Sequence, residues 1–381
     1  MLAQLPLSIS HDQTARQFHP QLGSLAWYLG RSVYLEAYWL RQVLCEDDDL
    51  TRRVEQLFTP GAMPLAQQCA ALPPFDHLLN WAAEIQDEHL RRLANPGELP
   101  DHPLLERARL AWFLLQEQAR NYEHMLMVLN QRQLQMSGAD YRVDQPLQAR
   151  LPQLGAQKVV QGHFRIGAVD DPAAYDNERP PQAVELSGFR IARRPVSNAE
   201  YLAFMERDGY CNRDWWSDAG WGWLQTAALE QPEQWRRDAD GHWYGIAVNG
   251  PADLPPEDPV SGISQHEAKA FAAWTASLGG ELAGAVLQHE YQWEIAARIG
   301  ALKERGRVRE WCANPFHPYP EYQPFPDPEV SQRFFNEGHM SLRGGSLHTQ
   351  SPLRRLSCRE HLPPEQRFAF SGTRLVFPAG D

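Results

Sequence analysis

The chain has 381 residues, enough for two domains, and its 43% hydrophobic and 22% charged residues are the mixture of an ordinary globular protein. The formal net charge is −12 and Lys and Arg form no clustered stripe, which argues against a protein that binds nucleic acid. No stretch approaches the roughly 18 uninterrupted apolar residues of a membrane-spanning helix, and the N-terminus lacks the pattern of a secretory signal. The five cysteines are odd in number and form no CxxC pair, so we expect reduced thiols in a cytoplasmic protein that does not contact membranes.

The first part of the chain, to about residue 137, has the apolar periodicity of helices. Four antiparallel helices with short connections are typical of a bundle, which we predict for residues 1–137. We expect these helices at residues 22–44, 50–58, 75–93 and 103–136.

From residue 138 the sequence changes to Gly, Pro and Asp between short alternating segments. This change predicts a linker over 138–158 and a second domain over 159–381, with mixed strands and helices, so the fold class is α+β. Ser264 and Glu267 are spaced as a capping box at the start of one helix. We expect strands at 159–166 and 183–191, helices at 197–207 and 264–278, and long loops at 212–262 and 312–336.

Seven segments of this second part resemble, in the same order, those of the formylglycine-generating-enzyme or sulfatase-modifying-factor domain. The resemblance implies an α+β domain related to C-type lectins. The segments are 162–167 (GHFRIG), 184–201, 259–274, 287–298 with Trp-Glu-Ile-Ala-Ala-Arg, 309–311 (REW), 343–346 (RGGS) and 372–375 (GTRL).

Most residues of these segments are expected to have structural roles. Tryptophans in a domain with little sheet are expected to fill its core, and charged residues beside them to form buried ion pairs that fix loops. The tryptophans are Trp274, Trp293 and Trp311, and the charged residues are Glu294, Arg298 and Arg343.

The whole chain resembles the EgtB-like sulfoxide synthases, in which a four-helix bundle of the DinB type precedes such a domain. The resemblance implies Fe(II), O2 and formation of a bond between a thiol and the imidazole carbon of histidine betaine. In that family the first helix begins Leu-(Gly/Ala)-His and the last carries His-x3-His-x-Glu. Here the corresponding residues are Ser24, Arg120, His124 and Leu126, so only His124 remains of the three ligand positions.

These replacements alter the chemistry of the site. Arg120 is a permanent cation that cannot ligate a metal, and the hydroxyl of Ser24 is a poor iron ligand. Fe(II) is therefore the cofactor implied by resemblance, but we expect it not to bind at the usual site.

Three functional interpretations remain open. The first is an EgtB-like oxidoreductase with an altered or relocated metal site, for which Glu36, His77, His89 and Glu123 are candidate donors. The second is a metal-free descendant that binds a small molecule or acts as a scaffold. The third is a copper- or thiol-dependent enzyme built on Cys312 and Cys358.

The substrate side of the resemblance rests on two C-terminal segments. Residues 311–320 resemble the loop that bears the family's active-site tyrosine, which implies that Tyr319 hands on a proton or an electron; the alternative is a tyrosine that only packs its ring. Residues 358–363 align with the family's substrate contacts. The expected ligand is a small molecule in a cleft between the two domains, and the candidate substrate-binding residues are Arg359, Glu360, His361 and Trp311.

Overall fold

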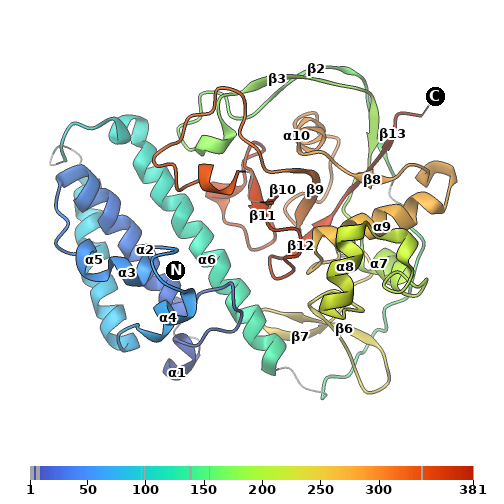
Figure 1. The fold of residues 1–381 in the computed structure, drawn as a ribbon, viewed down its shortest axis with the longest axis horizontal. Helices are drawn as coiled ribbons and strands as arrows, with labels where there is room; N and C mark the ends of the chain where they lie inside the picture. The colour runs from blue at the N-terminus through green and yellow to red at the C-terminus, as the bar shows by residue number, and fades with distance from the viewer. Residues whose placement is uncertain are drawn as a thin grey trace. The chain divides into compact units, whose positions relative to one another are not determined.

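The computed structural model describes residues 4–5, 9–95, 97, 99–136, 140–153, 155–335 and 338–380. The chain divides into two compact units, one of Met1–Met136 with Gln350–Leu353 and one of Ser137–Thr349 with Arg354–Asp381 (Figure 1). The expected domain ends at residues 137 and 138 lie outside the described residues. Helices dominate the first unit and strands with helices the second, so the predicted α+β class is confirmed.

The first unit is helical, and its helix α2 packs against α3, α5 and α6. The close approach of α2 to α3 requires Gly30, because a Cβ at that position would lie 2.3 Å from the ring of Phe58. The elements are α1 His11–Thr14, α2 Leu25–Ala37 with a π-helical extension Tyr38–Val43, α3 Thr51–Phe58, α4 Leu65–Ala70, α5 Phe75–Ala94, a 3-10 turn Pro103–Ala108 and α6 Arg109–Met136.

The four helices predicted for this unit are present, with three differences. The first begins at Leu25 rather than at residue 22, because Ser24 is its cap. The last one starts later than predicted, because Arg107 and Ala108 have φ of 53° and 57° and interrupt the helix before Arg109. The short α4 was not predicted, since six residues are too few to show an apolar period.

The second unit contains two four-stranded sheets, a three-stranded sheet and a hairpin, in the orders β1-β4-β13-β8, β11-β10-β9-β12, β5-β6-β7 and β2-β3. Strand β12 pairs with β9 in parallel, whereas β10 pairs with β9 and with β11 in antiparallel fashion. The strands are β1 Gln157–Val159, β2 Gly162–Ile166, β3 Gln182–Leu186, β4 Phe189–Ile191, β5 Trp235–Arg237, β6 Trp243–Ala247, β7 Gly250–Asp253, β8 Val286–Leu287, β9 Arg309–Pro315, β10 Met340–Arg343, β11 Glu360–Leu362, β12 Ser371–Thr373 and β13 Leu375–Pro378.

Two helices of this unit begin as the sequence predicts. Helix α7 (Asn198–Met205) is capped by Ser197, and α9 (Gln265–Ser277) by Ser264, whose Oγ accepts the N–H of Glu267 at 3.1 Å. The Glu267 carboxylate accepts the N–H of Ser264 at 2.7 Å in return, which completes the capping box. The remaining helices are α8 Asp218–Ala227 and α10 Glu290–Arg298.

The prediction that residues 212–262 form a loop is wrong. This stretch contains α8 and the whole β5-β6-β7 sheet. Its strands are only three to five residues long, too short to show a run of alternation. Each of the two predicted strands is also divided in two, at residues 160–161 and at 187–188.

The core of the second unit is aromatic. Trp274, Trp293 and Trp311 are at most 2% exposed, which confirms their predicted core role. Tyr201 and Phe271 stack with ring centroids 5.6 Å apart inside the same unit. No helix of the described part of the chain is both long and apolar enough to cross a membrane.

Candidate functional site

Ser24, at the first of the family's ligand positions, caps helix α2. Its Oγ accepts the backbone N–H of Trp27 at 3.1 Å, and its side chain is fully buried. Its own N–H donates to the sulfur of Cys69 at 3.3 Å. The hydroxyl therefore satisfies one of the backbone donors that a helix leaves free at its N-terminus.

His124, the remaining ligand position, lies on α6 against a tyrosine of α2. Its ring stacks on that of Tyr28, with centroids 5.3 Å apart and planes inclined by 19°. Tyr28 follows Ser24 by one helical turn, so the ligand positions of the first and last helices face the same part of the bundle core. Burial raises the pKa of the Tyr28 phenol, which accepts the N–H of Gly23 at 3.4 Å.

Arg120 lies one turn before His124 and forms an ion pair with Glu117 at 3.6 Å. Leu126, in place of the family's glutamate, is 8% exposed and apolar. A capping hydroxyl, a guanidinium and one imidazole stacked on a phenol do not fit iron at this position. Among the described residues, no three His, Cys, Asp or Glu side chains are grouped so that they could hold a metal ion.

Two of the alternative metal donors contact one another elsewhere in the helical unit. Nδ1 of His89 lies 3.3 Å from Oε2 of Glu36. Oε1 of the same carboxylate accepts N–H bonds from Gln86 at 3.1 Å and Gln118 at 2.5 Å. The carboxylate is thus satisfied by nitrogen donors. His77 is exposed on α5 and Glu123 is buried on α6.

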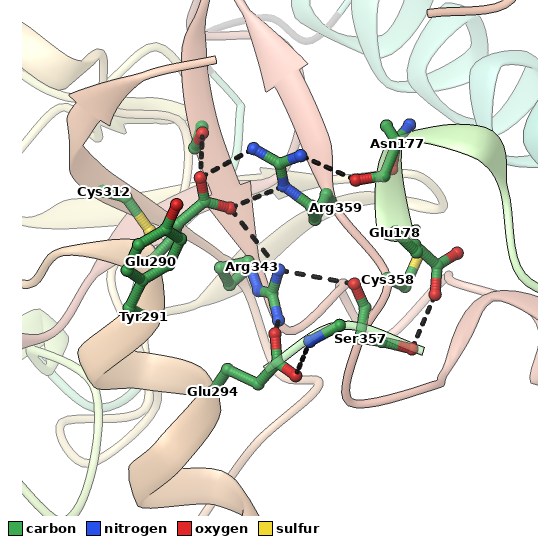
Figure 2. A network of polar contacts seen from close by, with 12 residues as sticks. Asn177, Glu178, Glu290, Tyr291, Glu294, Cys312, Arg343, Ser357, Cys358 and Arg359 are labelled. Carbon is green, nitrogen blue, oxygen red and sulfur yellow. Dashed lines mark hydrogen bonds and ion pairs between the residues drawn. The ribbon is translucent and has the colours of Figure 1, made fainter. Parts of the chain in front are cut away.

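The second unit contains a buried network of acids and arginines around α10. Figure 2 shows Glu290 and Glu294 extending from this helix toward Arg359 and Arg343. Arg359 donates to both oxygens of Glu290 at 2.8 Å, and Arg343 donates to Glu294 at 2.6 Å. Arg298 donates to Glu294 at 2.6 Å as well, which confirms the predicted ion pairs of Glu294, Arg298 and Arg343.

The arginines set the charge of Glu290. Burial alone would raise the pKa of this carboxyl, but the cations of Arg359 and Arg343 outweigh burial and hold its pKa at about 2. Glu290 is therefore ionised across the physiological range although it is only 2% exposed.

Arg359, a candidate substrate contact, is 1% exposed, and its guanidinium is engaged within the protein. Beyond Glu290 it donates to the carbonyls of Asn177 at 2.7 Å and His317 at 2.8 Å. Its guanidinium carbon also lies 4.3 Å from the ring centroid of Tyr319. These contacts hold the loop that carries Tyr319.

Tyr319, the candidate catalytic residue, is 2% exposed, and its hydroxyl has no hydrogen-bond partner among the described residues. Burial raises the pKa of the phenol, with Arg359 as an opposing influence, so the group stays protonated. The Tyr319 ring packs closely against the backbone at Gly167, because a Cβ at that position would lie 3.1 Å from Cε2 of Tyr319. The phenol is therefore buried and protonated, and its hydroxyl has no hydrogen-bond partner among the described residues.

The other candidate substrate contacts differ in exposure. Trp311 is fully buried and donates to the carbonyl of Ile263 at 2.8 Å, as a core residue would. His361 is half-buried on β11, its Nδ1 lies 2.8 Å from Nδ1 of His339, and its ring stacks on Phe316 at 4.5 Å. Glu360 is the preceding residue of the same strand, so its side chain points to the opposite face.

The loop that carries Tyr319 has a second set of contacts, which the sequence did not predict. The Asp176 carboxylate accepts the hydroxyl of Tyr322 at 2.5 Å and the N–H of Phe325 at 3.3 Å. Gln182 donates to the carbonyl of Pro320 at 3.1 Å. Nothing in the spacing of Asp176 pointed to this role, because its partners lie about 150 residues later.

Cys312 and Cys358 are both free thiols. Cys312 is fully buried, burial raises the pKa of its thiol, and its sulfur lies 3.7 Å from the carbonyl of Glu310. Cys358 lies 4.0 Å from a carboxylate oxygen of Glu360. Figure 2 shows Cys312 and Cys358 on opposite sides of Arg343 in this view.

The sequence of the chain is similar to a known domain family and to several known proteins. Residues 148–305 match the model described as the sulfatase-modifying factor enzyme 1-like domain. The chain is similar to the hercynine oxygenases of Mycolicibacterium thermoresistibile, at 33% identity over 56% of this chain, and of Mycobacterium tuberculosis, at 31% over 56%. It spans little more than half the length of these two proteins, 56% and 58%.

A third similarity extends over nearly the whole chain. The hercynine oxygenase of Mycolicibacterium smegmatis is 29% identical over 95% of this chain and 92% of its own length. The match thus includes the helical N-terminal unit as well as the second unit. A helical unit that precedes a sulfatase-modifying-factor domain, together with relatives of this kind, supports the identification of the chain as an EgtB-like family member.

Proposed function

We propose that this protein is an oxidoreductase of the EgtB-like class, of the sulfoxide synthase type, with altered metal and substrate sites. The observation that carries the proposal is the similarity to a hercynine oxygenase over 95% of the chain. The reaction of the class is O2-dependent formation of a carbon–sulfur bond.

Iron enters this proposal through the family alone. The hydroxyl of Ser24 caps a helix and Arg120 carries a positive charge, so the usual ligand positions do not supply a metal site. We therefore derive no catalytic step through iron.

Tyr319 is the residue of this chain that we propose to act on the substrate. Its hydroxyl is buried without a hydrogen-bond partner among the residues that the structure describes, and its raised pKa keeps the proton on the phenol. A protonated phenol can donate a hydrogen bond or a proton to a bound small molecule. Arg359 holds this group in place, both by donating to the carbonyl of His317 two residues earlier and by the contact of its guanidinium with the Tyr319 ring.

The substrate that we propose is a small molecule other than the family's usual betaine. Glu360 and His361 stand where the family has polar and aromatic substrate contacts. The imidazole of His361 lies against the ring of Phe316 and beside His339. A flat or cationic group would find the aromatic faces of His361 and Phe316 in this region.

The test is oxygen consumption by the full chain incubated with Fe(II) and a panel of thiols, each paired with histidine betaine or another imidazole. We expect thiol-dependent oxygen uptake and a product whose mass equals both substrates plus one oxygen, less two hydrogens. Tyr319→Phe should lower product yield at least tenfold, whereas Tyr244→Phe, at a similarly buried tyrosine of β6, should not. Absence of oxygen uptake with every pair would leave a metal-free binding or scaffold function as the better account.

A further inference from the structure

A row of polar side chains runs along one face of α2 and starts at Ser24, the residue that caps the helix. Ser24, Tyr28, Ser32 and Glu36 follow one another at intervals of four residues, so they lie on one face. Ser24 and Ser32 are fully buried and Tyr28 is 6% exposed. Burying polar side chains costs free energy unless each of them finds a hydrogen-bond partner.

Helix α6 presents a matching row to this face. The ring of His124 meets Tyr28, the amide of Asn121 donates to Oγ of Ser32 at 2.9 Å, and Gln118 donates to Glu36. Oγ of Ser32 donates in turn to the carbonyl of Tyr28 at 2.8 Å.

We call these side chains, with Gln86 and His89 of α5 that bind Glu36, the polar seam of the helical unit. It runs from residue 24 to residue 36 of α2, about 18 Å at the rise of an α-helix. Apart from Ser24, which caps α2, its members contact one another across three helices through these hydrogen bonds and the Tyr28–His124 stack.

We infer that the position of the family's iron has become one end of this polar seam, so that the helical unit folds and holds together without a metal. At that end the hydroxyl of Ser24 closes α2 and Tyr28 covers the face of His124. A metal bound by His124 would have to displace one of these contacts without gaining a second imidazole. The inference does not depend on the proposed reaction, because it concerns only which side chains occupy the family's iron position.

The first experiment measures metal binding by the full chain, purified without chelators, with Co(II) as the probe. We expect no visible absorption from Co(II) bound through His124. A metal that binds only the folded chain raises Tm, so excess Co(II) or anaerobic Fe(II) should change the Tm measured in EDTA no more in the wild type than in His124→Asn. A Co(II) spectrum or a Tm increase that His124→Asn abolishes would overturn the inference. Metal binding that survives His124→Asn, including binding that Glu36→Gln abolishes, would support it, since the metal would then lie elsewhere.

The second experiment restores the family's ligands in the variant Ser24→His/Arg120→His/Leu126→Glu. If this end of the seam is the former iron position, the variant should bind Co(II), and its Tm should rise on metal addition. A folded variant that stays metal-free would show that these three residues do not surround one point, and would overturn the placement.

The third experiment remains informative if that triple variant does not fold. A seam predicts coupling between Ser32 and Asn121, so Ser32→Ala and Asn121→Ala should each lower Tm by about 4 °C, while the double variant should lose much less than their sum. Thr226→Ala with Gln225→Ala, adjacent on the exposed side of α8, is the control pair, for which additive effects near zero are expected. Additive losses at Ser32 and Asn121 would contradict the seam.

Discussion

The imidazole of His124 lies parallel to the phenol ring of Tyr28, with centroids 5.3 Å apart and planes inclined by 19°. A ligating imidazole directs a nitrogen lone pair at the metal and needs further donors around that point. Here the ring face is used for packing, and the hydroxyl of Ser24, at another of the family's ligand positions, is used for capping. In this chain both positions thus serve the structure of the helical unit.

The cap at Ser24 has a measurable contribution to stability. Ser24→Ala leaves the N–H of Trp27 buried without its acceptor and should lower the free energy of unfolding by about 1 kcal/mol, within a range of about 0.5–2. Urea denaturation followed by far-UV circular dichroism measures this. Ser10→Ala is the matched control, because Ser10 precedes α1 at the cap position without a side-chain capping bond. Equal effects of the two substitutions would contradict the capping role.

We expect that a lysine cannot replace Arg359 without a loss of stability. Arg359→Lys keeps the charge but cannot reach Glu290, Asn177 and His317 together, so it should destabilise the second unit by about 3–5 kcal/mol. Thermal unfolding followed by tryptophan fluorescence measures the loss. Arg213→Lys, at an exposed ion pair with Asp218, should cost less than about 1 kcal/mol. A small effect at Arg359 would show that the loop is held by other contacts.

Local signals in the sequence predicted much of the fold. The serines before α7 and α9 lie where a capping residue is needed, and both caps are present. The helices of the first unit follow from their apolar period. Ser24, however, was assigned to the interior of a helix predicted from residue 22, so its capping role was hidden by an error of a few residues at the helix start.

Contacts between distant residues could not be predicted in the same way. The pairing of Arg359 with Glu290 joins residues 69 positions apart, and that of Tyr322 with Asp176 joins residues 146 apart. The segment resemblance located the loop of Tyr319 but not the side chains that hold it. The β5-β6-β7 sheet was missed because strands this short depend on their neighbours rather than on their own pattern.

Glu290 should make stability depend on pH in the acid range. Its pKa of about 2 in the folded protein lies below the usual glutamate value of 4.5, so the stabilisation is complete above pH 4.5 and is lost as the pH falls toward 2. The loss should be of the order of 3 kcal/mol between these limits, since one pKa unit corresponds to about 1.4 kcal/mol. Urea unfolding of the wild type and of Glu290→Gln at pH 5.5, 4.5, 3.5 and 2.5 measures it. The variant should be less stable at pH 5.5 and should show a flatter dependence below pH 4.5; parallel curves would contradict the assignment.

We expect that position 167 tolerates no side chain, because the backbone at Gly167 lies close to the ring of Tyr319. Its φ of +81° disfavours L-residues, and an added Cβ would lie 2.8 Å from the carbonyl of Glu178 and 3.1 Å from the Tyr319 ring. Gly167→Ala should therefore lower stability by about 1–3 kcal/mol and change the near-ultraviolet circular dichroism of the aromatic core. Gly222→Ala on α8 is the opposite control, because nothing lies within 4 Å of its added Cβ, and it should raise stability by about 0.5–1 kcal/mol. A Gly167→Ala variant as stable as Gly222→Ala would show that the loop of Tyr319 can shift to make room, and the rigid placement of that phenol would have to be abandoned.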